Sequence, residues 1–287
     1  MTAPLYPQRI ASWLPAQDAN WHKYNYGHVL VIAGSGGFYG AAVHSSLSAL
    51  RVGAGLVTVG VENNMNERLP LRYPDLMTWS MPARSEGWSI DELKQKIQQR
   101  KINTILIGPG LGQSEKLLGI VAETLLELSK LSIKVVVDAD ALAVLKDWKH
   151  KIKGSWVITP HAGEAKRMFA GDHLKLSAIS DWVHHTGIIC VLKHPRITIF
   201  NENGDTFDNT SGNTALAKAG TGDVLAGMIA GLLAQGCTAF QAAALASYMH
   251  GRAADLWCQE GREARSLLAS DLITMIPKVF YELRSYA

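Results

Sequence analysis

Short apolar runs that end at glycine or at a charged residue recur along the 287-residue chain and limit its fold more than any other feature. Residues 28–33, 104–107, 134–137 and 187–192 each have the length of a β-strand and are apolar at almost every position. A strand with apolar residues on both faces is buried on both faces, as in a parallel sheet covered by helices. Helical stretches between the runs therefore predict an α/β alternation.

We expect one α/β domain spanning residues 1–287, a three-layer sandwich with helices on both faces of a mainly parallel central sheet. No long repeat, low-complexity tract or linker interrupts the alternation. A hairpin is expected to cross Asn203-Gly204, a short helical turn is expected at 12–15, and Gly227 and Gly231 are expected to let their helix pack closely on the sheet. Loops at the carboxyl ends of the strands should gather into one crevice.

Charge and composition exclude several classes of partner. The net charge is +3, 47% of the residues are hydrophobic, and no dense Lys/Arg block is interleaved with aromatic residues, so no nucleic acid is expected. No apolar stretch resembles a membrane span or a signal peptide. Cys190, Cys237 and Cys258 match no zinc or redox spacing, which favours buried thiols in a reducing cytoplasm and no protein-bound metal.

The glycine-rich stretch 211–223 runs directly into an apolar helix and is the strongest functional signal. Such a turn and helix start expose unpaired N–H groups and the positive end of the helix dipole, which suits phosphate. A bound phosphate would raise the pKa of Asp223, and a carboxylate of that kind can take a proton from a reacting hydroxyl. Alternatively, Asp223 occupies the first turn only because the dipole favours it there.

Two further glycine-rich loops follow predicted strands at 34–40 and 108–112. The first does not match the dinucleotide-binding fingerprint, because its sixth position is Tyr39 instead of glycine. Asp138 and Asp140 follow another strand, and strand alternation would point both carboxylates to the same side. They could bind a metal-linked phosphate or a ligand hydroxyl, or one could cap the next helix.

His161 and Glu164 follow the predicted strand at 156–159 and favour a polar pair facing a substrate, because no third metal ligand lies nearby. A helix-capping role for Glu164 is the alternative. Lys193 ends a strand, where it could meet a nucleotide phosphate or be an ordinary exposed lysine. His184 and His185 are expected on the outside of a surface helix.

The ordered set of these motifs resembles the ADP-dependent NAD(P)H-hydrate dehydratases of the ribokinase-like superfamily, from about residue 20 onward. The motifs are Gly34-Ser35 to Ala42, 108–112, 138–142, 159–164, 191–193 and 220–223. The resemblance implies dehydration of the S form of hydrated NADH or NADPH. ADP or ATP would phosphorylate the added hydroxyl, which then leaves as phosphate.

The resemblance also implies roles for individual residues. Asp223 would be the catalytic base, and Mg²⁺ would accompany the nucleotide. The hydrated nicotinamide nucleotide would contact Ala42, Gly110, His161 and Asp223. The adenine nucleotide would contact Lys193, His194, Pro195, Arg196 and Ile197 together with Gly220, Thr221 and Gly222.

Some features depart from the family pattern. His194-Pro195 stands where members often have glycine after the lysine, and Thr214-Ala215 and Ala219-Gly220 replace Pro-Gly and Gly-Gly. Members are often fused to an N-terminal epimerase domain, and nothing before residue 20 corresponds to one, so a separate epimerase is expected. Relatives resemble homo-oligomers, often tetramers.

Three other functions compete with the dehydratase. A small-molecule kinase of the same superfamily, acting on a vitamin precursor or a sugar alcohol, would stop after phosphoryl transfer. A nicotinamide-dependent oxidoreductase would transfer hydride and require no ATP or ADP. A silent nucleotide-binding regulator would have no turnover at all.

Overall fold

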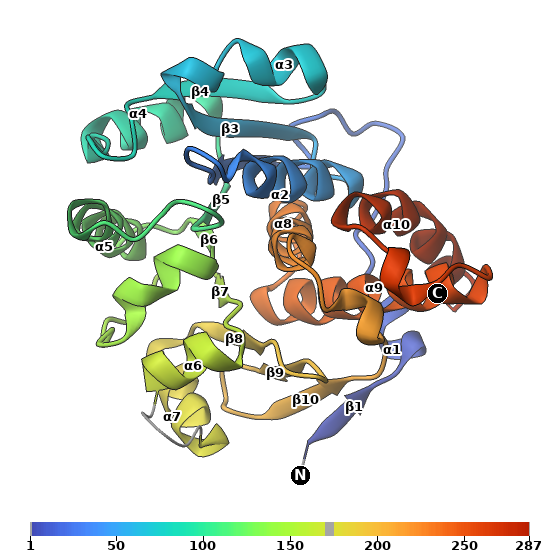
Figure 1. Ribbon diagram of the computed structural model, residues 1–287. Coiled ribbons are helices and arrows are strands. Elements are labelled where there is room, and N and C mark those ends of the chain that lie inside the picture. The colour runs from blue at the N-terminus through green and yellow to red at the C-terminus, as the bar shows by residue number, and fades with distance from the viewer. Residues whose placement is uncertain (1, 170–174, 287) are drawn as a thin grey trace.

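The computed structural model describes residues 2–169 and 175–286 and places ten strands in one sheet (Figure 1). The strand order is β1-β10-β9-β8-β7-β6-β5-β2-β3-β4. Strand β9 is antiparallel to β8 and β10, while the other neighbouring strands are parallel. The mainly parallel α/β sheet is therefore confirmed, and the hairpin expected across Asn203-Gly204 joins β9 to β10. The strands are β1 (Ala3–Leu5), β2 (His28–Ile32), β3 (Leu56–Glu62), β4 (Met77–Met81), β5 (Thr104–Ile107), β6 (Lys134–Val137), β7 (Trp156–Ile158), β8 (Ile189–Leu192), β9 (Thr198–Phe200) and β10 (Thr206–Asn209).

Helices cover both faces of the sheet, so the expected three layers are present (Figure 1). One face carries α2 (Tyr39–Arg51), α8 (Thr221–Ala234), α9 (Ala239–Gln259) and α10 (Ala269–Arg284). The other carries α4 (Ile90–Arg100), α5 (Glu115–Ser129), α6 (Ala162–Phe169), α7 (Leu176–Thr186) and the 3₁₀ helix η2 (Ala139–Leu145). The remaining short helices are α1 (Pro7–Ala11), η1 (Asn63–Met65), α3 (Arg68–Arg72), η3 (Thr214–Leu216) and η4 (Ala264–Ser266).

Alternate residues of the central strands enter two separate apolar cores. In β2, Val29 and Val31 belong to the core under α2 and α8, whereas Leu30 and Ile32 belong to the core under α4 and α5. All four side chains are fully buried. Burial on both faces explains why the sequence of this strand shows no polar alternation.

The central helix α8 packs against α2 through its glycines. A Cβ atom at Gly227 would lie 2.1 Å from the carbonyl oxygen of Ser45, and one at Gly231 would lie 2.5 Å from that of Ala49. The expectation that these glycines face the sheet was wrong, because the close approach is between two helix backbones. This contact fixes the start of α8 beside the first turns of α2.

Two strands and one helix differ from the sequence prediction. Strands β1 and β4 were not predicted, because β1 has only three residues and β4 is an edge strand with exposed alternate positions. The helical turn expected at 12–15 lies earlier in the chain, at Pro7–Ala11. None of the described helices combines the length and the apolar character needed to cross a membrane.

Candidate active site

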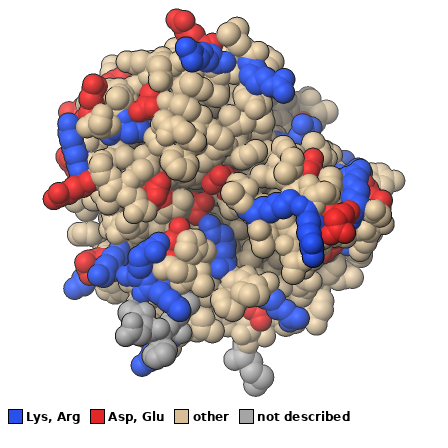
Figure 2. All heavy atoms as spheres, viewed as in Figure 1, with Lys and Arg blue, Asp and Glu red and all other residues tan. Residues whose placement is uncertain are grey.

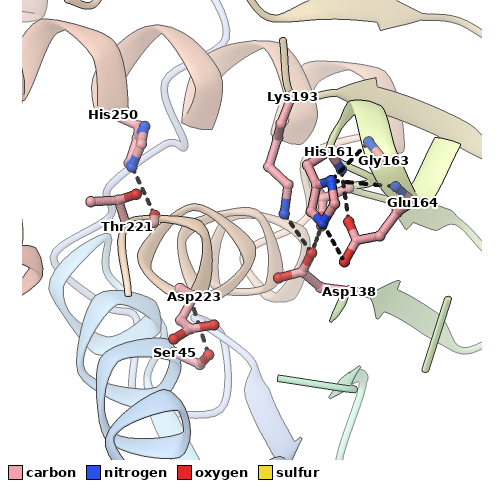
Figure 3. A network of polar contacts seen from close by, with 10 residues as sticks. Ser45, Asp138, His161, Gly163, Glu164, Lys193, Thr221, Asp223 and His250 are labelled. Atoms are coloured by element: carbon pink, nitrogen blue, oxygen red, sulfur yellow. Dashed lines mark hydrogen bonds and ion pairs between the residues drawn. The ribbon is translucent and has the colours of Figure 1, made fainter. Parts of the chain in front are cut away.

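The carboxyl ends of the parallel strands bring the sequence-predicted loops to one edge of the sheet, as expected. The loops are 34–40 after β2, 108–112 after β5, 138–140 after β6, 159–161 after β7 and 193–197 after β8. A parallel bridge between His161 and Lys193 continues the pairing of β7 and β8 beyond the strands. The start of α8 faces these loops, so one crevice contains nearly all of the predicted site (Figure 3).

The first turn of α8 is built around a glycine that no other residue replaces easily. Gly220 has a φ of 89°, and a Cβ atom there would lie 2.9 Å from the Cβ of Ala269. The hydroxyl of Thr221 donates to the carbonyl oxygens of Leu216 (2.9 Å) and Lys218 (2.8 Å), which closes the turn before the helix. The Thr221 N–H also donates to the Lys218 carbonyl at 3.4 Å, so Thr221 is held within the turn. The turn therefore fixes the neighbouring N–H groups of Gly220 and Gly222 in a position that suits an anion.

Asp223 lies in this first turn and is poised to exchange a proton near neutral pH. Burial is the main reason why the pKa of Asp223 is raised to about 7; the nearby carboxylates of Asp138 and Asp140 add to this shift, while Lys193 opposes it. The backbone carbonyl of Asp223 accepts a hydrogen bond from Ser45 Oγ at 3.2 Å. A carboxyl group with a pKa near 7 suits a general base better than an ordinary surface aspartate does.

Lys193 forms a buried ion pair opposite Asp223. Its Nζ donates to Asp138 Oδ1 at 2.7 Å (Figure 3). Thr159 Oγ1 donates to the same oxygen at 2.7 Å. The Asp138 side chain is 2% exposed and that of Lys193 is 21% exposed. A Cβ atom at Gly222 would lie 3.3 Å from Lys193 Nζ, so the ammonium group lies directly over the start of α8. Lys193 is thus not the ordinary exposed lysine that was the alternative.

The carboxylates of Asp138 and Asp140 both act on Asp223, but they accept hydrogen bonds from different neighbours. Strand β6 ends before them, and Ala139 takes a φ of 51°, a left-handed conformation that non-glycine residues seldom adopt. Asp140 accepts from the backbone N–H of Gly112 and the side-chain amide of Gln113, both at 2.8 Å. Neither aspartate side chain caps η2. No cluster of three potential metal ligands exists within the described ranges.

His161 and Glu164 cap the start of α6. The His161 N–H donates to Glu164 Oε2 at 2.7 Å, and the Gly163 N–H donates to His161 Nδ1 at 2.9 Å. This reciprocal pattern is a capping box with histidine in place of serine. Nδ1 is thus an acceptor, and the proton of the neutral ring resides on Nε2, which lies 3.4 Å from Glu164 Oε1. The capping alternative for Glu164 is correct, while the His161 side chain stays 54% exposed.

A cavity of 690 Å³ opens beside the start of α8. Most of the residues assigned to the adenine nucleotide line it, as do the loop 211–218 and His250. The assigned residues on its wall are Lys193, His194, Pro195, Ile197, Thr221 and Gly222. Arg196 lines an adjacent cavity of 320 Å³. Gly220 lies in the turn before α8 and does not line either cavity.

The residues assigned to the hydrated nicotinamide are divided: His161 lines the nucleotide cavity and Asp223 lies in the first turn of α8, whereas Gly110 and Ala42 belong to the glycine-rich loops after β5 and β2. Gly110 has a φ of 62° and lies against Phe38. Hydrogen bonds from the Gly34 N–H to the Pro109 carbonyl (2.8 Å) and from Ser35 Oγ to the Gly110 carbonyl (2.9 Å) join the two glycine-rich loops. Ala42 is fully buried beneath this loop pair, so it supports the loop without forming part of its surface.

Residues 29–278 match the NAD(P)H-hydrate dehydratase family. The chain belongs to this family. An ADP-dependent (S)-NAD(P)H-hydrate dehydratase from Bacillus subtilis is 33% identical over 286 residues, covering 98% of this chain and 99% of that protein. A bifunctional NAD(P)H-hydrate repair enzyme from Moorella thermoacetica is 34% identical over 95% of this chain, which spans only 52% of that relative.

Solved structures of similar proteins have the same architecture. The ADP/ATP-dependent dehydratase of Bacillus subtilis, crystallised with ATP and Mg²⁺, superimposes with a TM-score of 0.84 at 32% identity, covering 99% of both chains. A ribokinase-like superfamily protein from Enterococcus faecalis gives a TM-score of 0.82 at 27% identity and covers 100% of this chain and 96% of its own. These matches confirm the ribokinase-like fold and the family resemblance.

Two supporting residues of the dehydratase site were missed by sequence reasoning. His250 on α9 is buried, and its Nε2 donates to the Thr221 carbonyl at 2.9 Å, holding the first turn of α8 from behind. Arg84 is also buried, and its guanidinium donates to the carbonyls of Gly34 (3.0 Å) and Gly60 (2.7 Å) beneath the first glycine-rich loop. Neither residue lies in a recognisable motif, so only the tertiary fold reveals them.

Proposed function

We propose that the protein converts the S form of hydrated NADH or NADPH back to NADH or NADPH, consuming ADP or ATP and releasing phosphate. The observation that carries the proposal is the position of Asp223. Its carboxyl group has a pKa raised to about 7 and belongs to the first turn of α8, close enough to Asp138, Asp140 and Lys193 for their charges to act on it. This arrangement suits removal of a proton from a hydroxyl that attacks a phosphoryl group.

The reaction proceeds in two stages. The added hydroxyl gives its proton to Asp223 while its oxygen attacks the terminal phosphorus of the nucleotide, and AMP or ADP leaves. The N–H groups of Gly220 and Gly222 and the Lys193 ammonium stabilise the charge on the transferred group. The carbon–oxygen bond then breaks, phosphate departs with the bonding electrons, and the adjacent carbon loses a proton. Phosphorylation is needed because hydroxide is a far poorer leaving group than phosphate.

A magnesium ion fits this site only as part of the bound nucleotide. The described residues offer no cluster of three ligands, and one oxygen of Asp138 is already bonded to Lys193 and Thr159. Phosphate oxygens and water would therefore hold the ion. When bound, Mg²⁺ neutralises phosphate charge during transfer. The related Bacillus subtilis enzyme was crystallised with ATP and Mg²⁺.

Product analysis tests this proposal against a kinase of the same superfamily. The protein, hydrated NADH, Mg²⁺ and ADP are mixed, and AMP, inorganic phosphate and NADH are measured. The proposal expects all three products in equal amounts. A stable phosphorylated compound with no release of inorganic phosphate would indicate the kinase.

The cellular setting forms a separate part of the proposal. Cys190, Cys237 and Cys258 are free thiols, which supports a reducing compartment such as the cytoplasm. An epimerase would supply the S form from the other hydrate. We also propose a homotetramer, by analogy with relatives, and light scattering of the purified protein would measure its mass.

A further inference from the structure

A second cavity, of 410 Å³, lies beside the proposed active site between η2 and α6. Its apolar wall includes Leu142 and Met168, and Ala139, with its left-handed backbone, also lines it. The polar residues on its wall are Gln113, Lys146, Glu164, Lys166 and Arg167. The proposed mechanism does not use this cavity.

The cavity carries an excess of positive charge. Lys146 comes from the end of η2, and Lys166 and Arg167 come from the last turn of α6. All three side chains are exposed, and none of them forms an ion pair within residues 2–169 and 175–286. Figure 2 shows Lys and Arg side chains gathered over this part of the face, next to a central hollow that is lined by acidic side chains.

Two residues connect the cavity to the reaction centre. The Gln113 side chain on the cavity wall donates to Asp140, whose charge contributes to the raised pKa of Asp223. Glu164, also on the wall, holds His161, which lines the nucleotide cavity. The basic cavity therefore adjoins the crevice on the side away from the loop 211–218.

We propose that this basic cavity binds a phosphate group on the adenosine half of the hydrated dinucleotide substrate, an inference that rests on the proposed function. The substrate carries phosphates away from its reacting ring, and the 690 Å³ cavity is already assigned to ADP or ATP. A second set of cations is then needed for the substrate's own phosphates. The group is either the 5′-phosphate of the adenosine or, in hydrated NADPH, its 2′-phosphate.

The test compares two triple variants of the full-length protein. Lys146→Gln/Lys166→Gln/Arg167→Gln removes the basic cavity's charges. Lys149→Gln/Lys151→Gln/Lys153→Gln removes the same charge from exposed lysines before β7, at the opposite edge of the sheet. Exposed substitutions of this kind leave stability nearly unchanged, which melting temperatures would verify.

Kinetics are measured with hydrated NADH, hydrated NADPH and hydrated reduced nicotinamide mononucleotide, at saturating ADP. We expect the cavity variant to raise KM by at least about tenfold for hydrated NADPH, with or without an equal rise for hydrated NADH. The KM values for the mononucleotide and for ADP should stay unchanged. A rise in KM for hydrated NADPH alone would show that the cavity binds the 2′-phosphate. Equal rises for both dinucleotides would show that it binds the 5′-phosphate.

Two results would overturn the subsite while leaving the proposed function intact. The cavity variant could match the wild type and the control variant on all substrates, or it could impair the mononucleotide as strongly as the dinucleotides. Failure of the wild type to turn over any hydrate would instead overturn the proposed function together with the subsite.

Discussion

Replacing Asp223 with asparagine tests two effects of this side chain: its role as the proton acceptor in the reaction, and the destabilisation of the fold by its buried negative charge. The variant keeps the size of the side chain and its place in α8 but removes the proton acceptor. A general base contributes a factor of about 10² to 10⁴ to the rate, so we expect turnover of the hydrate to fall by that factor. Nucleotide affinity should change by less than about tenfold, because the N–H groups of the helix start and Lys193 remain in place.

The same substitution should stabilise the fold at high pH. The pKa of Asp223 rises from 3.8 to about 7 on folding. Between these values the folded protein binds more protons than the unfolded chain, so stability decreases as the pH rises and is lowest above about pH 7. The full shift corresponds to about 4 kcal/mol, and about 2 kcal/mol remains after allowing for the partial exposure of the side chain.

Urea unfolding and turnover assays measure both effects. Relative to the wild type, Asp223→Asn should gain about 2 kcal/mol in the free energy of unfolding above pH 7 and almost nothing below about pH 4. Unchanged turnover, or a stability difference that does not vary with pH, would refute the assigned role.

Three further predictions follow from the same geometry. The wild-type kcat/KM for the hydrate should rise with pH through about 7 as Asp223 loses its proton, and a pH-independent value would contradict the base. Gly220→Ala should lower the free energy of unfolding by more than about 1 kcal/mol and weaken ADP binding, because the φ of Gly220 is 89° and a Cβ atom there would collide with Ala269. Gly119→Ala is the control, because a Cβ atom at this position of α5 would have no neighbouring atom within 4 Å. Lys193→Met should destabilise the fold by about 2 to 4 kcal/mol, since it leaves the buried Asp138 carboxylate without its cation. It should also shift the pH profile of kcat/KM to higher pH, because Lys193 lowers the pKa of Asp223. An unchanged profile would argue against an interaction between the two residues.

The sequence predicts the central strands well because their burial leaves a plain signal. Strands β2, β5 and β6 are apolar at nearly every position, and the glycines or carboxylates after them mark where each strand ends. Strand β4 escapes the same reasoning because an edge strand with exposed alternate positions lacks a continuous apolar run. Local pattern therefore identifies the interior of the sheet better than its edges.

Contacts between distant segments determine the hydrogen-bond partners of the site residues, and local sequence does not show them. The backbone at Ala139 turns left-handed after β6, so Asp138 bonds with Lys193 while Asp140 bonds with the loop after β5. Strand alternation cannot anticipate that turn. The support of α8 by His250 likewise depends on packing between α8 and α9, and no local motif encodes it.

The most direct test of the proposed function follows the near-ultraviolet absorbance of the reduced nicotinamide ring. The protein is mixed with hydrated NADH, Mg²⁺ and either ADP or ATP, beside a reaction without nucleotide. We expect absorbance to recover only when a nucleotide is present, with one phosphate released for each NADH restored. No recovery with either nucleotide, by a protein that still binds ATP, would contradict the dehydratase and favour a small-molecule kinase.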